Sequence, residues 1–119
     1  MPFEITDRTA IAGIGQSEYG RFLPQSQLGL GATALRAALD DAGLTRADVD
    51  GLSIHMGWTL GVDYDRAAES YGLDVRWVSQ SWLHGRFATS ALQQAALAVA
   101  SGMANVVACV NATSFTRER

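Results

Sequence analysis

The segment Trp82-Leu83-His84-Gly85-Arg86 carries the residues best suited to bind a ligand. It precedes Phe87–Ser101, an alanine-rich stretch that is predicted to be a buried helix. Free N–H groups and the helix dipole at such an N-terminus favour negative charge. Gly85 would let an oxyanion or phosphate approach, with His84 or Arg86 assisting. The alternative is that Arg86 reaches solvent or a partner chain, and the sequence leaves the two readings balanced.

A glycine-rich segment, Gly13-Ile14-Gly15-Gln16-Ser17-Glu18, begins like a dinucleotide-binding fingerprint. Glu18 stands where the third glycine should be, and the following helix begins too far downstream to direct its N-terminus at a pyrophosphate. All nine basic residues are arginine, so a phosphate-binding loop built on a lysine is excluded. We therefore expect no nucleotide cofactor.

The remaining reactive side chains favour structural roles. His55 and His84 lack the spacing of a metal site, and His55 lies within a predicted strand. Asp63 and Asp65 stand where a helix should begin, with Asp63 as its N-cap. Cys109 lies in the middle of an apolar strand, where a thiol has neither the access nor the lowered pKa of a nucleophile. We expect no metal.

Predicted strands and helices alternate along the chain, which indicates an α/β fold with a mostly parallel sheet, β-α-β-α-β-α-β. Gly43, Gly72 and Gly102 are expected to end the three helices, and Thr45–Asp48 resembles a capping box. The last strand is apolar without alternation, so both of its faces should be covered. The expected strands are Thr9–Ile14, Leu52–Met56, Val75–Ser79 and Val106–Val110, and the helices begin near Ser26, Asp63 and Phe87.

Composition describes an ordinary globular chain of 119 residues with 48% hydrophobic and 18% charged residues. The net charge of −3 gives no electrostatic reason to expect nucleic acid, and one cysteine excludes an internal disulfide. No secretory signal is visible at Met1–Arg8, and no uncharged apolar run approaches the roughly 20 residues of a membrane span. We expect a cytoplasmic location. Because few residues follow the most apolar strand, residues 1–119 are expected to be one partial domain of a larger fold.

Four segments together resemble the N-terminal half of a thiolase-superfamily protein. The resemblance runs from Ile11 to Thr113 and is strongest to the sterol-carrier or lipid-transfer-protein type of thiolase, a branch that includes aldolases shortening steroid side chains as CoA thioesters. It implies a β-α-β-α-β-α-β-β half-domain whose fifth strand and second half are missing here. It also implies a homodimer in which the third strand pairs with its copy, placing Arg76, Trp77 and Val78 at the contact. The segments are Ile11–Arg21, Ala37–Leu44, Ala47–Leu52 and Ala95–Val110.

One position departs from the family. Thiolases carry a nucleophilic cysteine just before the glycine that opens the third helix, and matching Gly85 to that glycine places Trp82 where the thiol belongs. Neither Ser81 nor Leu83 can replace it, because an unassisted hydroxyl is a weak nucleophile. No catalytic residue is therefore assigned in this chain. The aldolase branch resembles the chain better, since it lacks the cysteine and works by proton abstraction, with acid–base residues in the second half.

Three functions remain open. The first is retro-aldol cleavage of a bulky, steroid- or lipid-type β-hydroxyacyl-CoA, with a small OB-type partner subunit as the resemblance implies. The second is an acetyl-CoA acyltransferase whose nucleophile lies elsewhere. The third is a non-catalytic lipid carrier or scaffold. Coenzyme A would enter only as part of the substrate, so no separate cofactor is expected.

Overall fold

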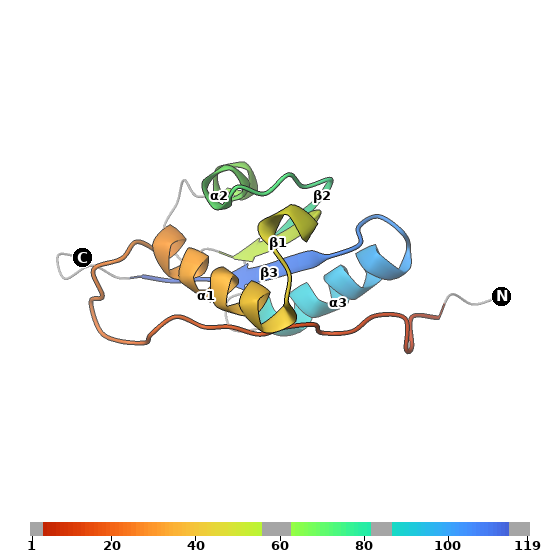
Figure 1. Ribbon diagram of the computed structural model, residues 1–119, viewed down its shortest axis with the longest axis horizontal. Coiled ribbons are helices and arrows are strands. Elements are labelled where there is room, and N and C mark those ends of the chain that lie inside the picture. Colours follow the sequence, from red (N-terminus) through yellow and green to blue (C-terminus); the bar gives the residue numbers. More distant parts are fainter. Residues whose placement is uncertain (1–3, 56–62, 82–86, 115–119) are drawn as a thin grey trace.

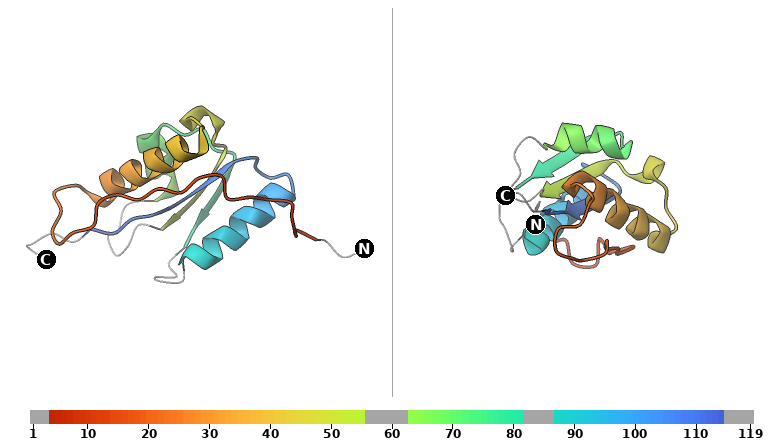
Figure 2. Two further views of the ribbon diagram at one scale, coloured as in Figure 1. Left: turned by 60° about the horizontal axis from the view of Figure 1, so that its bottom comes forward. Right: turned by 90° about the vertical axis from the view of Figure 1, so that its left-hand side faces the viewer.

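The computed structural model describes residues 4–55, 63–81 and 87–114. Three parallel strands form one sheet in the order β2-β1-β3, with β1 in the centre. Helices α1 and α2 cover one face of this sheet and α3 covers the other (Figures 1 and 2). The α/β fold with a parallel sheet is therefore confirmed. The elements are α1 (Gln27–Ala42), the 3-10 turn η1 (Arg46–Asp48), β1 (Gly51–His55), α2 (Tyr64–Tyr71), β2 (Trp77–Gln80), α3 (Phe87–Ala100) and β3 (Val107–Asn111).

The hydrophobic core lies between the sheet and the α1–α2 layer. Leu52 and Ile54 of β1 are fully buried there, and the alternation of the strand turns Ser53 towards α3. The Tyr71 hydroxyl of α2 donates to the Leu28 carbonyl of α1 at 3.1 Å, which ties the two helices together. Burial raises the pKa of Tyr71 to about 12, so this hydroxyl stays protonated and donating.

The predicted helix ends are confirmed. Ser26 caps α1 by accepting a hydrogen bond from the Gly29 N–H at 3.1 Å. Gly43, Gly72 and Gly102 all adopt the left-handed conformation, with φ between 69° and 84°. The capping box is present as well, with the Asp48 carboxylate accepting from the Thr45 N–H at 2.8 Å.

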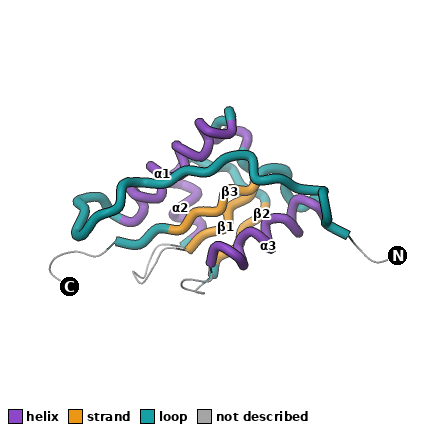
Figure 3. Tube along the Cα trace, turned by 90° about the horizontal axis from the view of Figure 1, so that it is seen from below, coloured by secondary structure: helices purple, strands orange, loops and turns teal. Residues whose placement is uncertain are grey.

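The predicted first strand, Thr9–Ile14, is wrong: the segment is extended but pairs with no described strand (Figure 3). Instead it lies against α1, where the Ile14 N–H donates to the Asp41 carboxylate at 2.9 Å. Gly13 and Gly15 make this approach possible, because a Cβ on either would collide with the main chain of α1. Ile11 and Ile14 consequently point outwards, 68% and 76% exposed.

The expectation that α3 and the last strand are covered on all sides is also wrong for the described residues. The face of α3 that carries Ala91, Ala95 and Ala98 is buried, but Leu92 and Leu97 are 45% and 48% exposed. Burial alternates along β3 in the same way. The uniform apolar pattern thus marks a second apolar surface that this part of the chain leaves open.

Asp50 joins the three strands at their amino ends. Its Oδ1 accepts from the Asn105 and Val106 N–H groups, both at 2.9 Å, and its Oδ2 accepts from the Arg76 side chain at 3.2 Å. Its own main chain bonds to Val106 and to Arg76. Desolvation alone would raise the pKa of Asp50, but the hydrogen bonds from Val106 and Asn105 and the Arg76 charge outweigh it and lower the pKa below 3.8.

We expect Gly15→Ala to destabilise the protein by about 1–3 kcal/mol, because its Cβ must displace the main chain of α1. Gly29→Ala is the matched control: its Cβ would meet nothing closer than 3.5 Å. Because alanine favours the helix, the control should be neutral or stabilising by up to about 1 kcal/mol. Urea unfolding of both variants measures this. Equal stability of Gly15→Ala and the wild type would contradict the close contact.

Asp50→Asn should cost about 1–3 kcal/mol of unfolding free energy, because the carboxylate that accepts several donors is lost. The folded pKa is depressed, so the folded chain holds fewer protons than the unfolded chain in acid. The stabilisation is complete above about pH 5 and is lost as the pH falls through 3.8 and below. The dependence of stability on pH in acid should therefore be flatter in Asp50→Asn than in the wild type. If the stability of Asp50→Asn falls with acid as steeply as that of the wild type, the link between Asp50 protonation and stability is refuted.

Candidate functional site

The carboxyl ends of the three strands meet at one edge of the sheet, and polar residues gather there. His55 ends β1, Gln80 ends β2 with Ser81 directly after it, and Asn111 ends β3. We call these four residues the carboxyl edge. Ligands of open parallel α/β sheets bind outside the carboxyl ends of the strands, so this edge is the candidate site.

His55 lies at the centre of the carboxyl edge and is 5% exposed. Its Nδ1 lies 2.7 Å from the Ser81 carbonyl oxygen. A carbonyl oxygen can only accept, so Nδ1 must carry the proton of this hydrogen bond. The His55 carbonyl in turn accepts from the Ala112 N–H at 3.1 Å. His55 was predicted to be structural, and these contacts connect it to the ends of both neighbouring strands.

Gln80 fixes the start of α2 against the end of β2. Its Oε1 accepts from the Tyr64 N–H at 2.9 Å, and its Nε2 donates to the Asp63 carboxylate at 3.0 Å. Asp63 occupies the N-cap position, as predicted, but its side chain caps no N–H group of the helix. The prediction was therefore right about the position and wrong about the partner, because Gln80 supplies the capping acceptor from another element.

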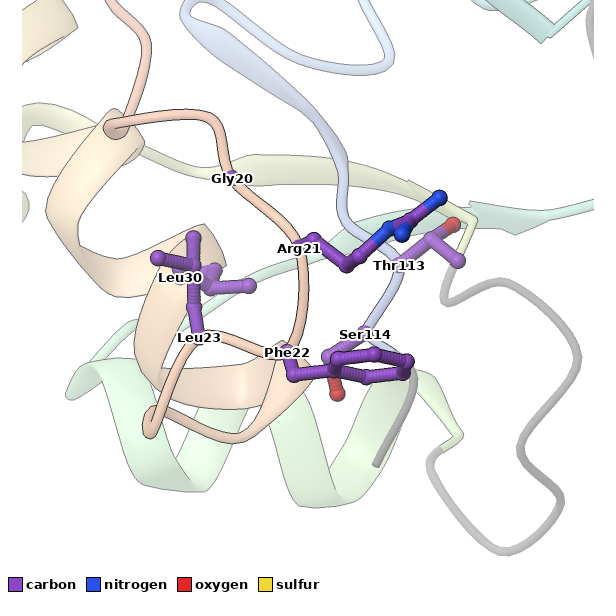
Figure 4. A pocket seen from close by; sticks show the side chains of 7 residues that line it. All are labelled: Gly20, Arg21, Phe22, Leu23, Leu30, Thr113 and Ser114. Carbon is purple, nitrogen blue, oxygen red and sulfur yellow. The ribbon is translucent and has the colours of Figure 1, made fainter. Parts of the chain in front are cut away.

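Two adjoining cavities of about 290 and 440 Å³ lie where the N-terminal segment and α1 meet the end of β3. In the smaller one, the Arg21 side chain extends towards Thr113 and the Phe22 ring lies beside Ser114 (Figure 4). The cavities share Gly20, Leu23, Leu30 and Thr113. Sequence analysis did not predict these cavities, because they depend on non-local packing of the segment around Gly20 against Thr113.

One backbone conformation and one buried side chain near these cavities are unusual. Phe22 has φ of 55°, a left-handed conformation that a bulky residue seldom adopts. Gln27 begins α1 at 4% exposure, and its amide has no hydrogen-bond partner among the described residues. Buried amides are normally paired, so Gln27 is a costly placement.

The residues predicted to bind substrate, His84, Gly85 and Arg86, lie outside the described residues, as does Trp82. Their predicted roles stay predictions. Arg76, Trp77 and Val78, the predicted dimer contact, are described: β2 is an edge strand of the sheet, and Trp77 and Val78 are half-buried. Arg76 is engaged with Asp50 at the opposite end of the strand from the carboxyl edge.

Cys109 stands apart from the carboxyl edge. It lies on β3 with its sulfur 3.9 Å from the Ala91 carbonyl, and it lines neither cavity. Although part of the residue reaches the surface, burial around the sulfur raises the pKa of the thiol to about 11. A thiol with this pKa is protonated at neutral pH, as predicted. The prediction that Cys109 lacks access is wrong, because the residue is exposed on the open side of β3.

Within residues 4–55, 63–81 and 87–114, no three histidine, cysteine or carboxylate side chains converge on a point that could hold a metal ion. In the same ranges, no helix is long and apolar enough to cross a membrane.

No family model matches the chain. It is 39% identical over 104 residues to a "steroid side-chain-cleaving aldolase" of Thermomonospora curvata. It is 36% identical over 110 residues to a "17-hydroxy-3-oxo-4-pregnene-20-carboxyl-CoA lyase" of Mycobacterium tuberculosis. These matches cover 87% and 91% of this chain but 26% and 28% of the relatives. The chain thus spans about a quarter of the length of the curated relatives it matches.

Two solved structures are also similar to the chain. The "Ltp2-ChsH2(DUF35) aldolase" superposes with a TM-score of 0.74 at 39% identity, covering 84% of this chain and 26% of that one. A priming β-ketosynthase from the R1128 polyketide pathway gives 0.65 at 19% identity, covering 86% of this chain and 41% of that one, a likeness of fold alone. The similarities to steroid side-chain aldolases support the aldolase resemblance that the residues predicted, whereas the ketosynthase bears on the fold alone.

Proposed function

We propose that the chain is part of a thiolase-fold lyase that cleaves a carbon–carbon bond of a bulky, steroid- or lipid-type β-hydroxyacyl-CoA. The similarity to the steroid side-chain-cleaving aldolase over 87% of the chain carries this proposal. The name of the second relative, a carboxyl-CoA lyase, supports the same reaction type and the thioester. We also propose that these residues form the N-terminal part of a longer thiolase of the lipid-transfer type.

The proposed reaction moves protons and needs no thiol. A base takes the proton of the β-hydroxyl, the Cα–Cβ bond breaks, and Cβ becomes the carbonyl carbon of a ketone or aldehyde. The released electron pair forms the thioester enolate, which an acid then protonates at Cα. Donors aimed at the thioester oxygen stabilise the developing negative charge. Trp82 at the thiol position and the raised pKa of Cys109 both fit a mechanism without an acyl-enzyme.

The proposed substrate contacts are His84, Gly85 and Arg86, which begin three positions after Ser81 in the sequence. Gly85 would admit an oxyanion or phosphate, the charge of Arg86 would complement it, and the His84 imidazole would donate a hydrogen bond. The cavities beside Asn111 and Thr113 open at the same edge and offer room for part of a large substrate. No separate cofactor is proposed, and the cytoplasm is the proposed location.

The proposed assembly is a homodimer that pairs β2 with its copy, with Arg76, Trp77 and Val78 at the contact. The position of β2 at the edge of the sheet supports this, because an unpaired edge strand offers hydrogen-bonding groups to another chain. A small OB-type partner subunit is also proposed. The name of the similar solved structure, an Ltp2–ChsH2(DUF35) aldolase, supports a second component.

The test is an assay of the full-length protein, alone and with a copurifying partner, on steroid β-hydroxyacyl-CoA thioesters. Mass spectrometry should detect a ketone or aldehyde together with the shortened acyl-CoA, and no free CoA. CoA-dependent acyl exchange would overturn the proposal in favour of an acyltransferase. Thioester binding without turnover would overturn it in favour of a carrier or scaffold.

Cys109→Ala should leave the lyase rate unchanged within about twofold, because the thiol lies against α3, lines neither cavity and is protonated, so it is no nucleophile. Iodoacetamide should label Cys109 slowly at pH 7 and faster as the pH approaches 11. A thousandfold loss of rate in Cys109→Ala, with the melting temperature unchanged, would contradict the prediction that Cys109 is no nucleophile. It would also contradict the proposed mechanism without a thiol.

A further inference from the structure

The two adjoining cavities, called here the paired cavities, reach from the carboxyl edge to the loop that precedes α1. Asn111, the last residue of β3, lines the larger one, and Arg21 and Phe22 line the smaller one. Because both share the wall around Leu30, a molecule that enters at the carboxyl edge can extend from one into the other. Together, the volumes of about 290 and 440 Å³ lie in the range of pockets that bind small molecules, roughly 300–1,000 Å³.

Apolar side chains and hydroxyl groups line the paired cavities together. Leu23 and Leu30 contribute to both, and Ala34 adds to the larger one. The hydroxyl-bearing residues Thr113 and Ser114 lie at the end of the described chain, beside the smaller cavity (Figure 4). An apolar wall with a few polar groups is typical of a site for an apolar small molecule whose oxygen atoms must be oriented.

The charges of the lining residues argue against the nucleotide part of a coenzyme A thioester. Among the described lining residues, Arg21 is the one cation, and Glu18 contributes a carboxylate to the larger cavity. Several phosphate charges would meet that carboxylate and the leucine side chains, and a buried charge without a partner is costly. A neutral ring system with isolated oxygens meets no such cost. The Arg21 side chain extends towards Thr113, where it can donate to one of those oxygens (Figure 4).

Phe22 is the unusual residue of the smaller cavity. Its φ of 55° is a strained conformation for a bulky side chain, and such strain gathers at sites that clamp a ligand. The ring is 43% exposed and lies beside Ser114 (Figure 4). Tyr19, which lines the larger cavity, is 83% exposed. Two aromatic side chains therefore present apolar surface at the paired cavities that an apolar ligand would cover.

We propose that the paired cavities bind the apolar acyl group of the thioester, with the thioester end near Asn111 and the Phe22 ring against the far end. The inference rests on the proposed function, which supplies a CoA thioester with a bulky acyl group. It adds which part of that substrate these residues take. The coenzyme A part lies outside the paired cavities.

The test measures binding to the full-length protein by calorimetry, with two probes. One is a steroid carboxyl-CoA without the β-hydroxyl, which cannot undergo the cleavage, and the other is free CoA. The ratio of the two affinities isolates the acyl group. Thr113→Trp places a large ring in the wall that both cavities share and should lower this ratio by at least about tenfold. Thr33→Trp is the matched control: this exposed threonine of α1 lines neither cavity, so the ratio should not change.

Phe22→Gly separates a ligand contact from a structural role. Glycine adopts a φ of 55° without strain, so the melting temperature should stay nearly unchanged while the affinity ratio falls about tenfold. A lower melting temperature with an unchanged ratio would show that the ring serves the fold alone, and would overturn its place against the acyl group.

Two further results would overturn the inference. If the wild type binds the steroid carboxyl-CoA no more tightly than free CoA, no acyl site exists. If Thr113→Trp weakens both probes equally, the paired cavities take the nucleotide part instead. Failure of the proposed function is distinct from either result. A full-length protein that does not cleave the β-hydroxyacyl-CoA would refute the lyase, while the affinity ratios would still decide where the acyl group binds.

Discussion

The sheet depends on the carboxylate of Asp50. One residue accepts from the chain that enters β3 and from the arginine that precedes β2, while its own main chain continues into β1. Parallel strands need long crossovers, so nothing local sets their relative register. A charged acceptor at the common starting point supplies that reference. The residues at the carboxyl ends of the strands, His55 and Ser81 included, therefore depend on Asp50 for their alignment.

Much of the fold was predictable because local chemistry and packing agree. Gly43, Gly72 and Gly102 each stop a helix in the conformation that glycine adopts without cost, and Ser26 caps α1 as its position indicated. The first strand was not predictable. Its alternating small and apolar residues satisfy the strand pattern, yet Gly13 and Gly15 use their missing Cβ to lie on a helix. Pattern alone cannot separate these two uses of glycine.

The candidate site was predictable only in part, for a related reason. Histidine and aspartate attract attention in a sequence, and both His55 and Asp63 do stand at the carboxyl end of the sheet. Their partners, however, are 26 and 17 residues away, and no spacing rule connects them. Gln80, which joins β2 to α2, carries no chemical signal at all. Burial, which gives the His55 contact its strength, exists only once the strands are paired.

The cap of α2 has a consequence for how the molecule forms. A helix of eight residues is too short to persist alone in water, and its leading amide is satisfied by a side chain sixteen positions later. The helix therefore needs β2 in place before it is stable, whereas α1 contains its own N-cap residue and can form early. The α2–β2 pair should behave as a single cooperative unit in folding, opening and closing together while the α1 layer stays intact.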